Sequence, residues 1–309
     1  MPAELSVNLA GVTLRNPIIA ASGTAAYVDE IADAIDLHDL GALVTKSITR
    51  EERRGNETPR IVDTACGMLN AIGLANVGLN RFMSEKAPRI VQVKTTIIGS
   101  IAGGSIKDYV AVASAFDSIE AMPMVEINVS CPNTADGLVF GENPARLSEL
   151  VREVRSALSR KKLIVKLSPN VSDLRPLARA TIEAGADALT LINTITGMAI
   201  DVKSRRPRLS TTMGGYSGPA IHPIAVRMVY EIYRDVARDA GIPIIGLGGV
   251  MSWSDAAEMI LAGASAVGVG TALFADPGVP KRIVRGLQRW MRAQGCECLG
   301  DLVGKVSPP

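Results

Sequence analysis

The sequence predicts an α/β fold of the (β/α)8 TIM-barrel type with an N-terminal β-hairpin. Eight short apolar runs alternate with longer helix-like segments along the 309 residues. Glycine is abundant, with 29 residues, and aromatic residues make up only 4% of the chain, which is typical of a core of parallel strands covered by helices. The main alternative is a doubly wound open sheet. That fold prefers a Gly-rich turn after its first strand, and Ser22-Gly23-Thr24 does not match such a turn.

The first 16 residues predict a β-hairpin. Leu5, Val7 and Leu9 alternate with polar residues, and a turn near Ala10-Gly11 precedes a second short apolar run. We expect this hairpin to plug the bottom of the barrel. The whole chain, 1–309, is predicted to be one domain, with a closing C-terminal helix and tail over 277–309.

The barrel strands and helices follow from apolar runs, caps and glycine stops. Expected strands are 18–22, 42–47, 97–102, 122–129, 163–168, 188–194, 242–247 and 266–270. Expected helices are 28–40, 105–116, 143–158, 172–184, 222–240, 254–262 and 279–293. Ser105 with Asp108 resembles a capping box, and Asn143-Pro144 supplies an N-cap and a first-turn proline. The segments 50–90 and 195–219 are expected to be long loops, and loops of that length are usually functional.

Charge and targeting signals exclude several functions. The formal net charge is +2, which gives no reason to propose nucleic acid or a membrane surface as a partner. The basic run at 203–208 is interpreted as a solvated loop, with a docking patch as the less favoured alternative. No signal peptide or membrane span is evident, so we expect a cytoplasmic protein. The four cysteines match neither a zinc nor an iron–sulfur spacing, and no metal site is expected.

Polar residues at the strand ends predict the site. Lys46, Asn128, Lys166 and Asn193 come from four different strands, and barrel enzymes build their sites at the C-terminal ends of strands. The Gly-rich turns at 246–249 and 268–271 occupy the usual phosphate position of such barrels. These glycines could instead merely permit tight turns, but their joint placement favours phosphate binding.

Cys131 lies just past the fourth strand, where Pro132 ends the strand. Taken alone, it is as readily a buried free cysteine as a catalytic thiol. An unperturbed thiol pKa of about 8.5 suits general-base chemistry if the site lowers it modestly. Glu126 is expected to point into the barrel below this level and is interpreted as structural. The two histidines, His38 within a helix signal and His222 at a helix start, offer neither acid–base chemistry nor a hydrolytic triad. The polar set therefore fits redox chemistry with a phosphate-bearing flavin.

Several motifs resemble those of the dihydroorotate dehydrogenase family. They are Thr-Lys-Ser (45–47), Leu-Asn-Ala-Ile-Gly-Leu (69–74), Asn-Val-Ser-Cys-Pro-Asn (128–133), Val-Lys-Leu-Ser-Pro-Asn (165–170), Ile-Asn-Thr (192–194), Gly-Gly-Tyr-Ser-Gly-Pro-Ala (214–220), Gly-Leu-Gly-Gly-Val (246–250) and Val-Gly-Thr (269–271). The likeness runs in order from about residue 5 to 275. The cysteine at the base position is similar to that of class 1 enzymes. The sequence around 192–220 and 244–277 most resembles the class 1B catalytic subunit.

The resemblance implies oxidation of dihydroorotate to orotate in pyrimidine biosynthesis, with FMN as cofactor and Cys131 as the base that removes the C5 proton. Implied FMN contacts are Ser22, Lys46, Ser47, Ser100, Asn128, Lys166, Ile192, Gly218, Gly248, Gly249, Gly270 and Thr271. Implied substrate contacts are Lys46, Asn70, Ala71, Ile72, Gly73, Leu74, Asn128, Asn193 and Thr194. Ser100 departs from the family pattern, which usually has an asparagine there.

Class 1B further implies a partner subunit that carries FAD and a 2Fe–2S cluster and passes electrons to NAD. The implied assembly is a homodimer of this chain joined by two such subunits, a heterotetramer. Cys296 and Cys298 are interpreted as incidental. The alternatives are a class 1A enzyme that uses fumarate, a related dihydropyrimidine-type flavin barrel, and a barrel that has lost catalysis and acts as a scaffold. The segment 134–142 is expected to be a mobile cover over the substrate.

Overall fold

The computed structural model describes residues 4–129 and 140–307, and within them eight parallel strands close into a barrel. The strands are β3 (Ile18–Ala20), β4 (Ala42–Val44), β7 (Thr96–Ile101), β8 (Met124–Asn128), β9 (Lys162–Lys166), β10 (Ala188–Leu191), β15 (Ile244–Leu247) and β16 (Ala266–Val269). They follow one another around the barrel in chain order, and β16 pairs with β3 to close it. The predicted (β/α)8 class is therefore confirmed.

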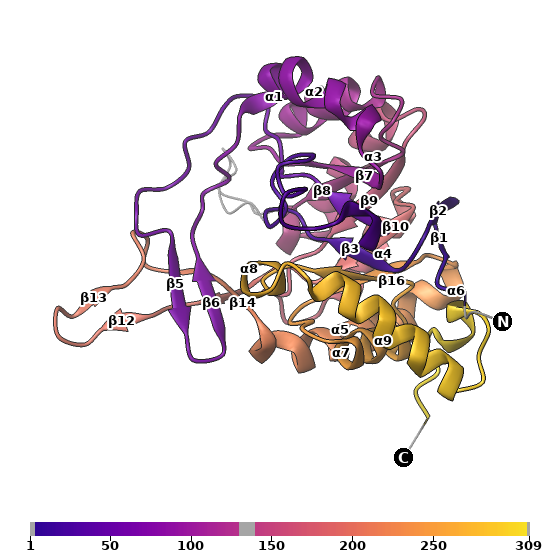
Figure 1. The fold of residues 1–309 in the computed structure, drawn as a ribbon. Helices are drawn as coiled ribbons and strands as arrows, with labels where there is room; N and C mark the ends of the chain where they lie inside the picture. The colour runs from indigo at the N-terminus through magenta and orange to yellow at the C-terminus, as the bar shows by residue number, and fades with distance from the viewer. Residues whose placement is uncertain (1–3, 130–139, 308–309) are drawn as a thin grey trace.

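The N-terminal hairpin plugs one end of this barrel. Strands β1 (Val7–Leu9) and β2 (Val12–Leu14) pair in antiparallel register. Leu9 and Leu14 are fully buried and pack with inward-facing residues such as Ile98 and Met124 of the barrel strands. Figure 1 shows the hairpin at one end of the barrel and strands β5, β6 and β14 at the opposite end. The hairpin thus leaves the C-terminal ends of the strands available for a site.

Helices cover the outside of the barrel between successive strands. They are α1 (Gly78–Arg81), η2 (Phe82–Lys86), η3 (Ala87–Gln92), α2 (Ile106–Asp117), α3 (Pro144–Ala157), α4 (Arg175–Glu183), α5 (His222–Ile232), η6 (Tyr233–Ala237), α6 (Arg238–Ala240), α7 (Trp253–Ala262), α8 (Ala272–Ala275) and α9 (Val279–Ala293). Short 3-10 turns are η1 (Leu37–Asp39), η4 (Phe140–Glu142), η5 (Pro219–Ile221) and η7 (Leu299–Leu302). The side chain of Asn143 accepts hydrogen bonds at the start of α3, as its sequence predicted.

The predicted helix over 28–40 is wrong. This segment consists of turns that end in η1. Its acidic side chains bond to the local backbone: Glu30 accepts from the N–H groups of Tyr27 and Val28, and Asp36 accepts from the N–H of His38. Such side-chain bonds compete with the helical hydrogen bonds of the backbone, and an apolar period alone does not reveal them.

The two segments expected to be loops build a second sheet. Strands β5 (Ile61–Thr64), β6 (Gly67–Asn70), β14 (Gly214–Ser217) and β11 (Ile195–Gly197) form one antiparallel sheet. Sequence patterns missed it because each strand has only three or four residues, and because the β6–β14 pairing joins parts of the chain about 145 residues apart. This sheet brings the motif around Asn70 next to the motif around Gly215.

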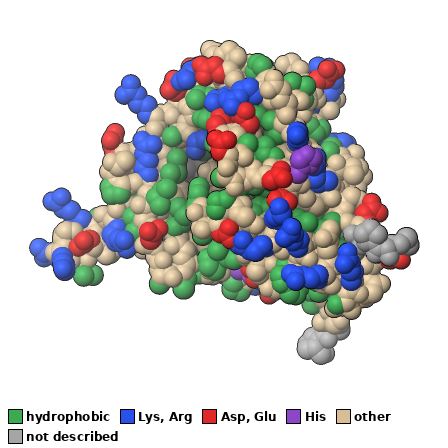
Figure 2. All heavy atoms as spheres, viewed as in Figure 1, with side chains coloured by type: hydrophobic (Ala, Val, Ile, Leu, Met, Phe, Trp, Pro, Cys, Tyr) green, Lys and Arg blue, Asp and Glu red, His purple; other side chains and the backbone are tan. Residues whose placement is uncertain are grey.

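A two-stranded arm extends from this sheet (Figure 1). It contains β12 (Ile200–Asp201) and β13 (Arg206–Pro207), and every residue from 201 to 208 is exposed. Figure 2 shows Lys and Arg side chains gathered at its tip. The basic run is therefore solvated, as expected, although it forms a hairpin rather than an irregular loop.

Candidate active site at the C-terminal ends of the barrel strands

Polar side chains from five barrel strands join in one chain of hydrogen bonds at the C-terminal mouth. The hydroxyl of Ser47 lies 2.8 Å from that of Ser100 and 3.4 Å from that of Ser22. Asn128, the last residue of β8, donates from its side chain to Ser47 over 3.4 Å. Asn193, just after β10, donates to the side-chain oxygen of Asn128 over 3.1 Å. The fold thus brings together five residues that the sequence had assigned to one site.

Two residues that sequence reasoning missed hold this chain in place. Thr45 is fully buried, and its hydroxyl accepts a hydrogen bond from the N–H of Ser100. Tyr109 of α2 is also fully buried, and its hydroxyl donates to the carbonyl of Asn128 over 2.7 Å. A tyrosine on the apolar face of a helix was a usable signal, because a buried phenol needs a partner.

Two lysines come from the C-terminal ends of barrel strands. Lys46 follows β4, and burial, together with the nearby charge of Arg60, lowers the pKa of its ammonium group. Lys166 ends β9 with 6% of its surface exposed; burial lowers its pKa, and the carboxylate of Glu126 opposes that effect. Among the described residues, no side chain accepts a hydrogen bond from either ammonium group. Two partly desolvated cations suit the binding of an anionic ring or carboxylate.

Glu126 lies inside the barrel, as expected. It shares a face of β8 with Met124, which belongs to the barrel interior, and it is only 2% exposed. Its Oε2 accepts a hydrogen bond of 2.7 Å from Thr190 of β10. Burial raises the pKa of this carboxyl group, whereas the charge of Lys166 and the bond from Thr190 lower it.

The glycine turn after β15 and Gly218, just after β14, form a close-packed cradle. Gly249 has φ +66°, and a Cβ there would lie 2.8 Å from the carbonyl oxygen of Gly218. Gly218 has φ +111°, and a Cβ would lie 2.6 Å from Gly67. The hydroxyl of Thr271 donates to Ser217 over 2.8 Å, which joins the turn after β16 to the second sheet. Backbone N–H groups in so tight a turn can approach a phosphate closely.

Gly248, Gly270 and Ile192 complete the predicted cofactor set. Gly248 precedes Gly249 in the same turn, and a Cβ there would lie 3.6 Å from Ile192. Ile192 is 1% exposed, and its N–H donates to Leu247 at the end of β15. Gly270 lies beside Ala21, after β3, so these residues line neighbouring strand ends.

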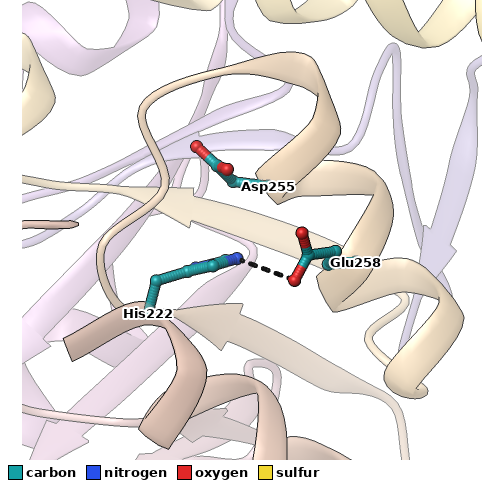
Figure 3. A group of neighbouring side chains, drawn as sticks. All are labelled: His222, Asp255 and Glu258. Carbon is teal, nitrogen blue, oxygen red and sulfur yellow. Dashed lines mark ion pairs between the residues drawn. The ribbon is translucent and has the colours of Figure 1, made fainter. Parts of the chain in front are cut away.

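His222, at the start of α5, lies beside Asp255 and Glu258 of α7 (Figure 3). Nδ1 of His222 lies 2.8 Å from the carbonyl oxygen of Gly248, so Nδ1–H donates to that oxygen. Its Nε2 points to Glu258, 3.6 Å away, and Asp255 lies within 4.8 Å of both. These three residues have a spacing that could hold a metal ion. Asp255 already caps α7 by accepting from two backbone N–H groups, so we interpret the group as support for the turn.

The second sheet carries the predicted substrate residues at 70–74. Asn70 donates to the carbonyl of Gly215 over 3.2 Å. Gly215 packs so closely on Thr194 that a Cβ there would lie 2.2 Å from the threonine hydroxyl. Thr194 in turn donates its N–H to the side chain of Asn193. The backbone of Ala71 and Ile72 forms hydrogen bonds with the segment 56–60. Gly73 and Leu74 both have positive φ. The substrate motif is therefore linked to the strand-end chain through Gly215.

Cys131 lies outside the described residues. Residues 134–139 of the predicted cover, 134–142, also lie outside them. The last described residue before it is Val129, directly after Asn128. The three cysteines that the structure describes, Cys66, Cys296 and Cys298, are free.

Comparison with known proteins places this site in a family. The profile of the family described as dihydroorotate dehydrogenase matches residues 4–291. The chain belongs to the dihydroorotate dehydrogenase family. It is thus an oxidoreductase, the resemblance found in its motifs is confirmed, and the family implies a flavin cofactor.

Near full-length relatives refine this likeness. The chain is 50% identical over 307 residues to a protein of Pelobacter propionicus named dihydroorotate dehydrogenase B (NAD(+)), catalytic subunit, covering 99% of each chain. A protein of Bacteroides thetaiotaomicron with the same name is 45% identical, with 98% of this chain and 99% of the relative covered. A relative from Aquifex aeolicus, provisionally named dihydroorotate dehydrogenase A (fumarate), is 46% identical, with 97% and 98% covered. Within the described residues of this dehydrogenase, no helix is long and apolar enough to cross a membrane.

Proposed function

We propose that this protein oxidises dihydroorotate to orotate in pyrimidine biosynthesis with FMN bound at the C-terminal mouth of the barrel. The observation that carries the proposal is the hydrogen-bonded chain of Ser22, Ser47, Ser100, Asn128 and Asn193 at the strand ends. Lys46 and Lys166 come from strand ends of the same barrel. Membership of the dihydroorotate dehydrogenase family supports the same reaction.

The residues present fit FMN. The close packing of Gly218 against Gly249 leaves room for backbone but not for side chains, as a phosphate site requires. The two lysines supply positive charge without a competing acceptor among the described side chains. The flavin would supply a two-electron acceptor for the hydride from C6 of the substrate. The proposed FMN contacts are Ser22, Lys46, Ser47, Ser100, Asn128, Lys166, Ile192, Gly218, Gly248, Gly249, Gly270 and Thr271. Ser100 is engaged by Ser47, which supports a role for its short side chain in the network beside the flavin.

Substrate binding is proposed at the asparagines and the 70–74 motif. Side-chain amides of Asn70, Asn128 and Asn193 would bind the ring amides and carboxylate, together with Lys46 and Thr194. The backbone of Ala71, Ile72, Gly73 and Leu74 would complete this contact. Cys131 would take the C5 proton as general base.

Electron transfer to a partner subunit is the next part of the proposal. Two relatives are named as catalytic subunits of an NAD(+)-linked enzyme, which supports a partner that carries FAD and a 2Fe–2S cluster. Large apolar side chains at Met198, Ile200, Val202 and Met213 are exposed on and beside the β12–β13 arm, and exposed apolar residues of this size favour association. We propose a cytoplasmic heterotetramer in which a homodimer of this chain binds two such subunits.

A class 1A enzyme that reduces fumarate is the second candidate, because the Aquifex aeolicus relative is nearly as similar as the others. The test is anaerobic: dihydroorotate, but not dihydrouracil, should bleach the bound flavin of the purified chain. Fumarate should not reoxidise that flavin, whereas NAD should do so only when the partner subunit is added. Bleaching by dihydrouracil would contradict the substrate, and rapid reoxidation by fumarate would favour class 1A.

A further inference from the structure

Glu126 and Lys166 form a buried pair of opposite charge beneath the strand-end network. Glu126 is 2% exposed and Lys166 is 6% exposed, and they lie on the adjacent strands β8 and β9. Their side chains do not form a direct ion pair, and within the described chain Glu126 is the charged group that acts on Lys166. Charged groups this deeply buried are retained only where something stabilises them.

The strand register places the carboxylate under the lysine. Lys166 is the partner of Asn128 on one side and of Thr190 on the other. Glu126 lies two residues before Asn128 on β8, yet its Oε2 accepts from Thr190 of β10. The Glu126–Thr190 bond therefore spans β9 on the inner side of the barrel, from the level of Ile164 to that of Lys166.

One oxygen of this carboxylate has no donor. Oε1 of Glu126 is buried and lacks a hydrogen-bond partner among the described atoms. A fixed negative charge that is only half satisfied by hydrogen bonds is stabilised by the nearest positive charge, which is Lys166. Burial alone would favour the neutral form of both groups, and each charge opposes that effect on the other.

We propose that Glu126 is a positioning residue that keeps the Lys166 ammonium charged below the mouth, so that Lys166 can stabilise the electron-rich ring of the reduced flavin. This inference rests on the proposed function, because it requires a flavin at the mouth. It gives a role to a residue that the sequence indicated only as structural. Glu126 itself does not touch the reacting atoms; it acts through Lys166.

The proton count of flavin reduction tests this role. When Lys166 stays charged, two electrons enter the flavin with one proton, because the lysine already balances the negative ring. When Lys166 is neutral in the oxidised protein, it takes up a second proton as the ring becomes negative. A buried lysine without a counter-charge titrates as much as about 3–5 pH units below its usual value, which falls in the measurable range.

The experiment is to measure the midpoint potential of the bound FMN between about pH 6.5 and 8.5, a range in which neither an ordinary carboxyl nor an ordinary lysine titrates. In the wild type, the slope of the midpoint potential against pH should correspond to one proton taken up per two electrons. In Glu126→Gln this slope should become steeper and correspond to two protons per two electrons. The amide keeps the acceptor for Thr190 but removes the charge. The double variant Glu126→Gln with Lys166→Arg should return the slope to one, since a guanidinium stays charged at every pH in the range.

Glu85→Gln is the matched control, because it removes one negative charge from a half-exposed pair on the surface. Its slope should equal that of the wild type. A wild-type slope of two protons, or an unchanged slope in Glu126→Gln, would overturn the proposal. If Glu126→Gln does not fold, Glu126→Ala removes the same charge and takes its place, with the same slope of two protons expected. Failure of the proposed function is recognised separately, as a wild-type protein that binds FMN but is not reduced by dihydroorotate.

Discussion

The side chain of Asn193 donates a hydrogen bond of 3.1 Å to the side-chain oxygen of Asn128, although the two residues are 65 positions apart in the chain. Asn128 is the last residue of β8 and Asn193 lies just after β10, so the bond exists only because these two strands end at the same mouth. It orients two amides toward one point, and a flat ring with several amide groups is the ligand that such a pair suits.

Asn193→Ala should weaken substrate binding while leaving the flavin in place. The loss of an amide that bonds a substrate group costs about 1–3 kcal/mol, so we expect KM for dihydroorotate to rise by roughly tenfold or more. The proposed flavin contacts come from other side chains, so the flavin content should not change. Steady-state kinetics and the flavin absorbance ratio check this. Loss of flavin together with activity would show that Asn193 supports the cofactor instead.

Cys131→Ala should keep the flavin but lose most of the turnover near neutral pH, because no base would remain to take the C5 proton. The effect of removing a general base is about 10²–10⁴-fold. Cys131→Ser should shift activity to higher pH, because a hydroxyl is a much weaker acid than a thiol. Stopped-flow reduction of the flavin against pH measures both. Unchanged reduction rates in Cys131→Ala would exclude the thiol as the base.

Gly249→Ala should impair FMN binding more than Gly270→Ala does. At Gly249 the backbone has φ +66°, and a Cβ would lie 2.8 Å from the carbonyl oxygen of Gly218. At Gly270 a Cβ would meet only ordinary contacts of 3.8 Å or more. We expect the Kd for FMN to rise by about tenfold or more in the first variant, since strain of this kind costs about 1–3 kcal/mol. Fluorescence titration of the apoproteins measures both, and equal effects would contradict the cradle at Gly249.

Glu30→Gln should destabilise the fold at neutral pH by about 1 kcal/mol, a value reduced for solvent screening. Burial alone would raise the pKa of Glu30, but hydrogen bonds from Lys86 and from the Val28 N–H lower it to about 2. Because the folded pKa lies below the unfolded one, this contribution is present above about pH 4.5 and is lost as the pH falls toward 2.

Urea unfolding at several pH values tests this. The difference between wild type and Glu30→Gln should shrink as the pH falls below 4.5. Glu85→Gln removes a half-exposed ion pair with Arg81 and should lower the free energy of unfolding by less than about 0.5 kcal/mol at any pH. A constant difference across the pH range would mean that the charge of Glu30 contributes nothing and only its shape matters.

The barrel was predictable from short stretches of the chain, because each barrel strand and most of the helices carry their own local pattern. The apolar run before Asn128, the cap at Asn143 and the stripe from Leu147 to Leu158 all formed as their spacing predicts. The strand-end position of Lys166 was also readable, since a polar residue that ends a buried strand must face the mouth or solvent.

Tertiary structure alone decided the second sheet and the partners of Glu126. The β6–β14 pairing joins segments about 145 residues apart, and Thr190 reaches Glu126 from 64 residues away. No local pattern encodes such contacts, because they depend on which strands the closed barrel makes neighbours. Periodicity reports which face of an element is buried, whereas only the fold determines which charge or hydroxyl that face meets.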